Sequence, residues 1–360
     1  MSDRQPADSQ QIPSWTSAFV QGVTSAARRS ITRREDDVDG SIRTVAVAFL
    51  ANVVVAAAKY GAFFLSGSSS ILAEALHSTS VTVNQALLLR GRLSSMHPPT
   101  RLHPFGFGLA RYFWAFVVSV VIFGIGAILS FLRGLLALGA EGHEIHTPWV
   151  PYAALTVGLV MDGSSFLVAM QQAKREKGDL SYWQYIKRSR NPEVPMVMLE
   201  DSAAIVGLAF AYTGVTLTLL TGNALYDAIG SICIGLLLAT VSFVMAREMK
   251  SLLLGESATP EQEQEIRAVL TGHDAVRDVI YFRSLYLGPD SLLVEAKVAF
   301  PDDMRFPEIA EAIDSMEAAI RERVAVAQAV SIEPGVAEPH DVDVPGYQSD
   351  RGPDGYGRSD

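Results

Sequence analysis

Long apolar blocks with short polar connections fill the chain from about residue 44 to residue 246. A helix needs about 20 mostly apolar residues to cross a bilayer core of about 30 Å. Barrel strands fit poorly, because the blocks are too long and do not alternate apolar with polar residues. The sequence therefore predicts an α-helical membrane protein with six transmembrane helices at 44–65, 71–90, 112–138, 150–172, 196–220 and 225–246.

Lysine and arginine are distributed unevenly around these blocks. Residues 1–43, the regions joining the second block to the third and the fourth to the fifth, and residues 247–250 carry 18 of them. The other three connections carry none. Because cytoplasmic loops carry the excess of Lys and Arg, the pattern predicts a multi-pass protein with both termini in the cytoplasm. We expect that membrane to be the plasma membrane.

The region 256–334 reads as a small soluble domain. Thr259, Pro260 and Gln262 match a helix start with a capping box. Two β-rich runs, 279–287 and 292–300, flank a turn, and a run of helical periodicity and a short strand at 329–332 follow. The order α-β-β-α-β predicts a C-terminal cytoplasmic α+β domain of the ferredoxin-like kind.

These features divide the chain into four parts. We expect a basic N-terminal segment at 1–43, a transmembrane domain at 44–250, the α+β domain at 256–334 and a disordered tail at 335–360. The α+β domain has 16 acidic and 7 basic residues, a net charge of −9. It lacks the basic surface that nucleic acid requires, so no nucleic-acid partner is expected.

Ionisable residues inside the apolar blocks are the candidates for chemistry, because charge at membrane depth is costly and usually faces a bundle interior. Imidazole with carboxylates suits divalent zinc, manganese or iron. These groups bind metal only when deprotonated, so loading a metal releases protons. We expect Asp162 to serve helix packing and Asp227 to cap the helix that it begins. The six candidates are Glu74, His77, Asp162, Glu200, Asp201 and Asp227.

Four runs carry a resemblance to a known family. They are SSSILAEALHSTSVTVNQ at 68–85, HPFGFGLARYFWAF at 103–116, SRNPEVPMVMLEDSAAIVG at 189–207 and TGNALYDAIGS at 221–231. They resemble the cation diffusion facilitators, and the last two are similar to the branch of zinc transporter 9-like proteins. The resemblance implies a homodimeric secondary transporter in membrane lipid. Such a transporter exports a divalent metal from the cytosol against protons, by alternating access.

The resemblance also implies where the metal binds. The family uses two residues four apart on the second helix and two on the fifth, which here are His77 with Val81 and Val197 with Asp201. Valine stands at position 81, where aspartate is usual. Glu74 and Glu200 are nearby carboxylates that can complete the set. The expected metal ligands are therefore His77, Asp201, Glu200 and Glu74.

The metal in this reading is a transported substrate, and no permanently bound cofactor is expected. Zinc fits best, with manganese, iron or cobalt as further possibilities. The strands of 256–334 lack the histidines that relatives use to bind metal, which favours dimerisation as the role of this domain.

Two other functions compete with transport. Val81 favours a degenerate relative that acts as a regulatory or dimerisation subunit without transporting. An enzyme has no support in the sequence, since it has no nucleophile–base pair, Gly-rich phosphate loop or HExxH motif.

Overall fold

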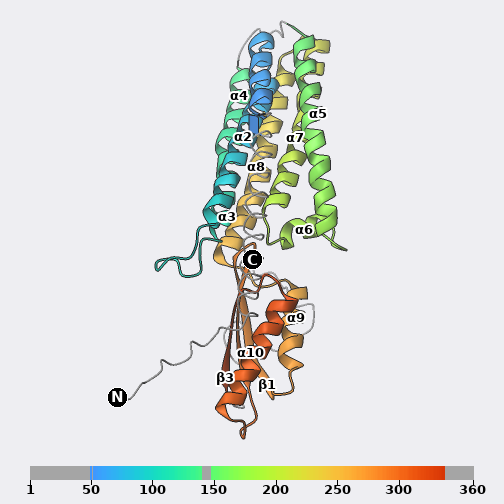
Figure 1. The fold of residues 1–360 in the computed structure, drawn as a ribbon. Coiled ribbons are helices and arrows are strands. Elements are labelled where there is room, and N and C mark those ends of the chain that lie inside the picture. Colours follow the sequence, from blue (N-terminus) through green and yellow to red (C-terminus); the bar gives the residue numbers. More distant parts are fainter. Residues whose placement is uncertain (1–48, 51, 140–146, 337–360) are drawn as a thin grey trace, which may run out of the picture. The chain divides into compact units, whose positions relative to one another are not determined.

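The computed structural model describes residues 49–50, 52–139 and 147–336. The predicted N-terminal segment 1–43 and residues 337–360 of the predicted tail lie outside the described residues. The described chain forms a helical part followed by an α+β part (Figure 1). The helical part consists of the helix Asn52–Ser66, α2 (Ser69–Ser95), α3 (Ala110–Val121), η1 (Ile122–Ile128), α4 (Leu129–Leu138), α5 (Trp149–Glu176), α6 (Tyr182–Arg188), α7 (Glu193–Thr221) and α8 (Leu225–Leu254).

Among the described residues, four helices are long and apolar enough to cross a membrane. They are Ala110–Leu138, which joins α3, η1 and α4, together with α5, α7 and α8. The helix Asn52–Ser66 is apolar but shorter, and the start of the predicted span 44–65 lies outside the described residues. The count of six spans therefore stays a prediction for the first two blocks.

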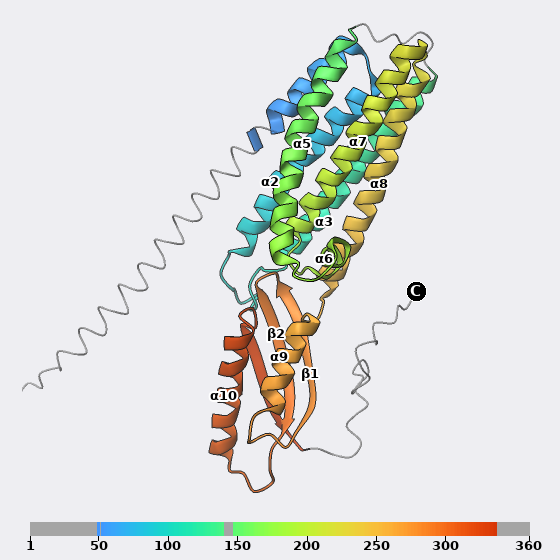
Figure 2. The same cartoon turned by 90° about the vertical axis from the view of Figure 1, so that its right-hand side faces the viewer.

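Helix α2 is long but rich in polar residues, and its environment explains how it tolerates them. It contacts α3, η1, α4, α5, α7 and α8, so other helices surround it on most sides (Figures 1 and 2). Apart from Ile71, the side chains that it buries are small or polar, among them Glu74, His77, Ser80 and Asn84. Apolar neighbours thus shield a polar helix that would be costly to expose to lipid.

Glycines let α8 approach α4 very closely. A Cβ at Gly235 would lie 2.7 Å from the backbone nitrogen of Phe131, and one at Gly134 would lie 2.6 Å from the side chain of Ile232. Small residues at such contacts are the usual means of packing helices in membranes, because they let backbones come together.

The prediction for Asp227 is wrong in an informative way. Its carboxylate accepts hydrogen bonds from the Ser68 hydroxyl (2.8 Å), the Ser70 backbone N–H (3.2 Å) and the Ser69 backbone N–H. Asp227 sits in the first turn of α8, yet it caps α2. The first N–H groups of any helix lack partners within the helix, and those of α2 are buried, so a carboxylate from α8 satisfies them.

The C-terminal part has the predicted order α-β-β-α-β. Strand β1 pairs antiparallel with β2, β2 pairs parallel with β3, and α9 and α10 cover one face of the sheet (Figure 2). The predicted capping box of Thr259 and Gln262 is confirmed. The elements are α9 (Pro260–Thr271), β1 (Asp278–Gly288), β2 (Ser291–Ala299), α10 (Phe306–Arg323) and β3 (Ala329–Gly335).

The fold and the charge pattern together predict sidedness. Replacing Cys233 by serine removes the one native cysteine, so single cysteines can be added for labelling. Asn223, to be replaced by cysteine, lies in the turn between α7 and α8, and Asp179, also to be replaced by cysteine, lies in the turn between α5 and α6. Between the two turns the chain forms α6, which is too short to span a membrane, and α7, which is long enough to span one. A membrane-impermeant maleimide applied to intact cells should label Asn223→Cys and spare Asp179→Cys until the cells are opened. Labelling of both from the outside would rule out the predicted orientation.

Asp227→Ala should lower the free energy of unfolding by about 2 kcal/mol or more, because it leaves a hydroxyl and two buried N–H donors without an acceptor. Thermal unfolding in detergent, followed by circular dichroism, measures the change. Asp179→Ala, at an exposed turn, is the matched control. An unfolding midpoint equal to that of the control would contradict the role of Asp227 as the cap of α2.

Candidate functional site

The candidate ligands lie where α2 and α7 run antiparallel. At one end of this stretch, Asn84 Nδ2 donates a hydrogen bond to Glu200 Oε1 at 2.9 Å. At the other end, Glu74 Oε1 lies 2.8 Å from the position that a Cβ of Gly207 would take. These two contacts bring residues 74–84 of α2 beside residues 200–207 of α7, and this stretch contains His77, Val81 and Asp201.

His77 and Asp201 are buried without full sets of partners. His77 is 3% exposed, and neither of its ring nitrogens has a hydrogen-bond partner within the described part of the chain. Asp201 is 8% exposed, and the same holds for its Oδ2. Buried polar groups are nearly always paired, so these unpaired atoms are candidates to bind a cation.

Glu200 and Glu74 each have a partner of their own. The amide of Asn84 donates to one carboxylate oxygen of Glu200, two turns along α2 from His77. Glu74 Oε2 accepts a hydrogen bond at 3.2 Å from Lys59 Nζ, on the helix Asn52–Ser66. The four predicted ligands are thus paired to different degrees: Glu200 and Glu74 each have one oxygen with a side-chain partner, whereas neither ring nitrogen of His77 has a partner among the described residues.

Lys59 is the functional candidate that the sequence reasoning missed. Its ammonium lies 3.2 Å from Glu74 and 3.7 Å from Asp162 on α5, and it is only 2% exposed. A signal was present, because Lys59 is the one charged residue of the apolar block 44–65. The prediction that Asp162 serves helix packing alone is incomplete, since its carboxylate faces this ammonium.

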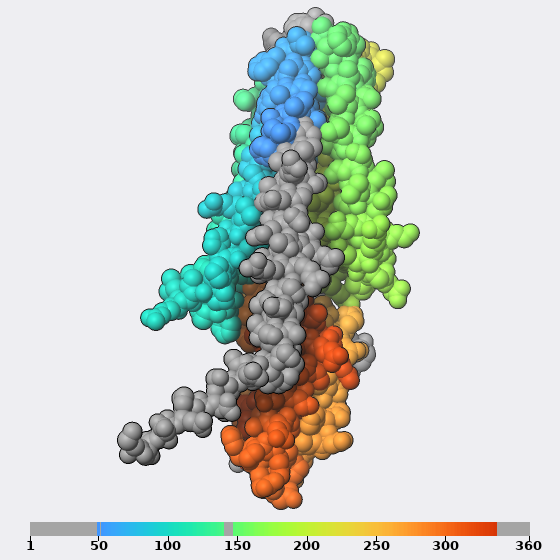
Figure 3. Space-filling model, in the orientation of Figure 1, coloured from blue at the N-terminus to red at the C-terminus, as the bar shows by residue number. Residues whose placement is uncertain are grey.

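A groove leads towards Lys59 from the edge of the bundle. It has a volume of about 360 Å³ and lies between the helix Asn52–Ser66 and the first half of α5. Figure 3 shows these two helices, blue and green, side by side on the face towards the viewer. Apart from Lys59, its walls are small or apolar side chains such as Ala58, Ala62 and Val157.

These groups do not form a preassembled metal cluster. In the described ranges, no three His, Cys, Asp or Glu side chains are grouped so that they could hold a metal ion together. The arrangement offers one imidazole and one carboxylate oxygen without hydrogen-bond partners, on two neighbouring helices. A cation bound there would need further ligands from water or from a shift of α2 against α7.

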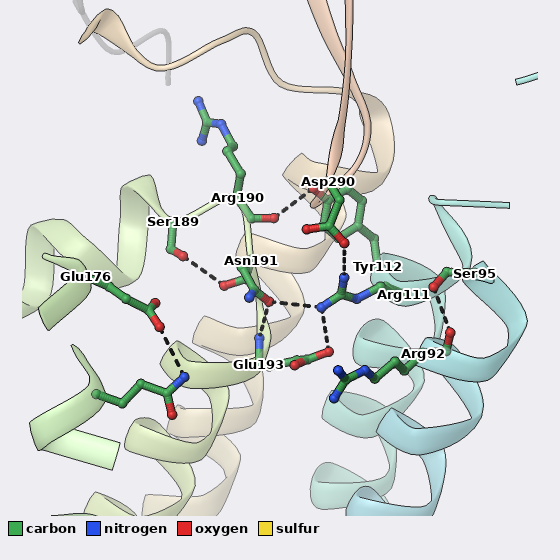
Figure 4. Close-up of polar contacts among 11 residues, drawn as sticks. Arg92, Ser95, Arg111, Tyr112, Glu176, Ser189, Arg190, Asn191, Glu193 and Asp290 are labelled. Atoms are coloured by element: carbon green, nitrogen blue, oxygen red, sulfur yellow. Dashed lines mark hydrogen bonds and ion pairs between the residues drawn. The ribbon is translucent and has the colours of Figure 1, made fainter. Parts of the chain in front are cut away.

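Polar contacts fix the N-terminal end of α7 (Figure 4). Arg111 on α3 donates to Glu193 at 2.6 Å and to Asp290, in the turn between β1 and β2, at 2.8 Å. The Tyr112 hydroxyl donates to the carbonyl of Arg190 at 2.8 Å, and Arg190 forms an ion pair with Glu256. Sequence reasoning had used these arginines for orientation only. They also set the position of the helix that carries Glu200 and Asp201.

Comparisons with known proteins place the chain in a family context. A family model described as the cation efflux transmembrane domain matches residues 45–254. The proton-coupled zinc antiporter SLC30A9, mitochondrial, of Homo sapiens is 36% identical over 264 residues, which are 72% of this chain and 46% of that protein. The chain thus matches about half the length of this relative.

Two further relatives have names that refer to metals. Metal tolerance protein C4 of Arabidopsis thaliana is 32% identical over 281 residues, 77% of this chain and 61% of that protein. The manganese efflux system protein MneP of Bacillus subtilis is 25% identical over 267 residues, 70% of this chain and 82% of that protein.

Proposed function

This chain belongs to the cation efflux family, and we propose that it exports a divalent metal cation from the cytosol in exchange for protons. Its apolar helices and its family make it an integral, multi-pass membrane protein. Zinc is the substrate that we favour, because the relative from Homo sapiens is named a zinc antiporter and an imidazole ligand suits zinc. Manganese is the next candidate, given the name of the Bacillus subtilis relative.

One observation carries the proposal. His77 on α2 and Asp201 on α7 are both buried where these two helices meet, and the described residues leave both nitrogens of His77 and one oxygen of Asp201 unpaired. An unpaired buried polar atom costs about 1–3 kcal/mol. A cation that binds these atoms offsets that cost. The buried site is therefore more stable when it holds a cation than when it is empty.

The same two residues can couple metal to protons. Each binds a cation only when deprotonated, so a proton and a metal compete for the same atoms. In an alternating-access cycle, α2 and α7 first expose His77 and Asp201 to the cytosol, where they bind the metal. They then expose the two residues to the opposite side of the membrane, where protons replace the metal. Glu200 stays bonded to Asn84 and Glu74 to Lys59 in the resting arrangement.

We propose that the protein works as a homodimer, through the α+β domain, with both termini in the cytosol. The plasma membrane is our first choice of location. The name of the Homo sapiens relative specifies mitochondria, so fractionation of cells that express a tagged copy is the direct check.

A second function has its own supporting observation. Val81 lies between His77 and Asn84 on the face of α2 that meets α7, and it brings no ligand atom to the site. A chain that binds metal too weakly to transport it would act as a regulatory partner of another subunit.

His77→Ala and Asp201→Asn should each weaken Zn²⁺ binding at least tenfold, because even groups that only orient a metal ligand contribute about 10- to 100-fold. Equilibrium dialysis of the purified protein in detergent measures the affinity. His97→Ala and Asp179→Asn, both exposed in connections, are matched controls and should bind as wild type does. Wild-type affinity in both site variants would move the site elsewhere.

Val81→Asp should tighten Zn²⁺ binding by about tenfold or more, since it adds a carboxylate one turn from His77. Reconstituted liposomes with an imposed pH gradient distinguish the two functions. We expect wild type to move Zn²⁺ against protons and Val81→Asp to do so at lower Zn²⁺ concentration. Transport by Val81→Asp alone would identify the natural chain as a non-transporting relative.

A further inference from the structure

A buried charge cluster lies beside the candidate site and takes no part in the proposed transport. The ammonium of Lys59 lies 3.2 Å from Glu74 Oε2 and 3.7 Å from Asp162 Oδ2. The side chains of Lys59 and Glu74 are 3% and 1% exposed. The three residues come from three helices and carry a net charge of −1. Charge at this depth is costly, so a cluster of this kind calls for an explanation beyond packing.

Two glycines make room for the cluster. A Cβ at Gly158 on α5 would lie 3.2 Å from Cε of Lys59, and a Cβ at Gly207 on α7 would lie 2.8 Å from Oε1 of Glu74. Both glycines lie inside helices, where alanine is the better helix former. Their helical backbones do not require glycine, but a Cβ at either position would push against the side chain of Lys59 or Glu74.

The two carboxylates share one cation, the ammonium of Lys59. Their oxygens lie 3.2 and 3.7 Å from it and are therefore less than about 7 Å apart. Oε1 of Glu74 is buried and has no partner among the described residues. His77 follows Glu74 by three positions on α2, on the same helix face, and its ring nitrogens are also unpaired.

We propose that Lys59 determines how many cations the chain holds. Its ammonium occupies a second cation site formed by Glu74 and Asp162, and it keeps Glu74 away from His77. With lysine at position 59 the second site is closed to metal, and the chain carries a single divalent ion at His77 and Asp201. A neutral residue at position 59 opens the second site. This inference rests on the proposed function only for the ion at His77 and Asp201.

The test counts ions. Purified protein in detergent is titrated with Mn²⁺, which oxygen ligands favour, while electron paramagnetic resonance measures the free ion. Lys59→Gln should bind about one more Mn²⁺ per chain than wild type. Lys59→Arg, which keeps the charge, should bind no more than wild type, and Lys59→Gln combined with Glu74→Gln should lose the additional ion.

A second measurement covers a variant that folds poorly. If Mn²⁺ replaces the ammonium, it stabilises the folded state of Lys59→Gln, and the unfolding midpoint should rise by more than about 3 °C with saturating Mn²⁺. The rise should be smaller in wild type and in the double variant, which lack the additional ion. The proposal is overturned if Lys59→Gln binds no additional ion, or if it cannot be recovered folded even with Mn²⁺ in every buffer.

The two proposals fail separately. The additional ion of Lys59→Gln should also appear in an Asp201→Asn background, where the transport site is impaired. A wild type that binds no metal, together with a gain of one ion in Lys59→Gln, would refute the proposed function and leave this inference standing. A gain that disappears in Asp201→Asn would instead mean that Lys59 acts on the transport site itself.

Discussion

The polar character of α2 is the constraint on which the helical part depends. This helix brings carboxylate, imidazole, amide and hydroxyl groups to membrane depth, where no solvent satisfies them. The neighbouring helices supply partners one by one: Asp227 of α8 caps its first turn, Lys59 pairs with Glu74, and Glu200 of α7 meets Asn84. The packing of the neighbouring helices therefore follows from the need to supply partners for the buried polar groups of α2.

Features that are local in the sequence could be predicted from it. The apolar blocks predicted the helices, because length and hydropathy are enough to identify them. The capping box at Thr259 predicted the residue at which α9 begins. The β-rich runs around a turn and the run of helical periodicity predicted the order of the α+β domain. Each of these depends on neighbours within a few residues, so one sequence carries enough information.

Features that depend on which helix faces which could not be predicted in this way. Asp227 has the position of a cap for its own helix, and only the approach of α2 to α8 gives it another role. Lys59 and Glu74 are 15 residues apart and Glu74 and Gly207 much further. Their contact depends on the rotation of three helices, which hydropathy along the chain does not fix.

The unpaired atoms complete this account. Several polar groups that support the bundle have found a partner, as Asp227, Glu200 and Asn84 Nδ2 have. Both ring nitrogens of His77 and Oδ2 of Asp201 lack one among the described residues. Natural chains tolerate such violations mainly at functional sites, where the cost is offset elsewhere. Here the offset is the paired surroundings of α2, which hold the two candidate ligands in position without satisfying them. A site that offers a cation few protein ligands, held in fixed positions, can release the cation again. A site that supplied a full set of ligands would retain it.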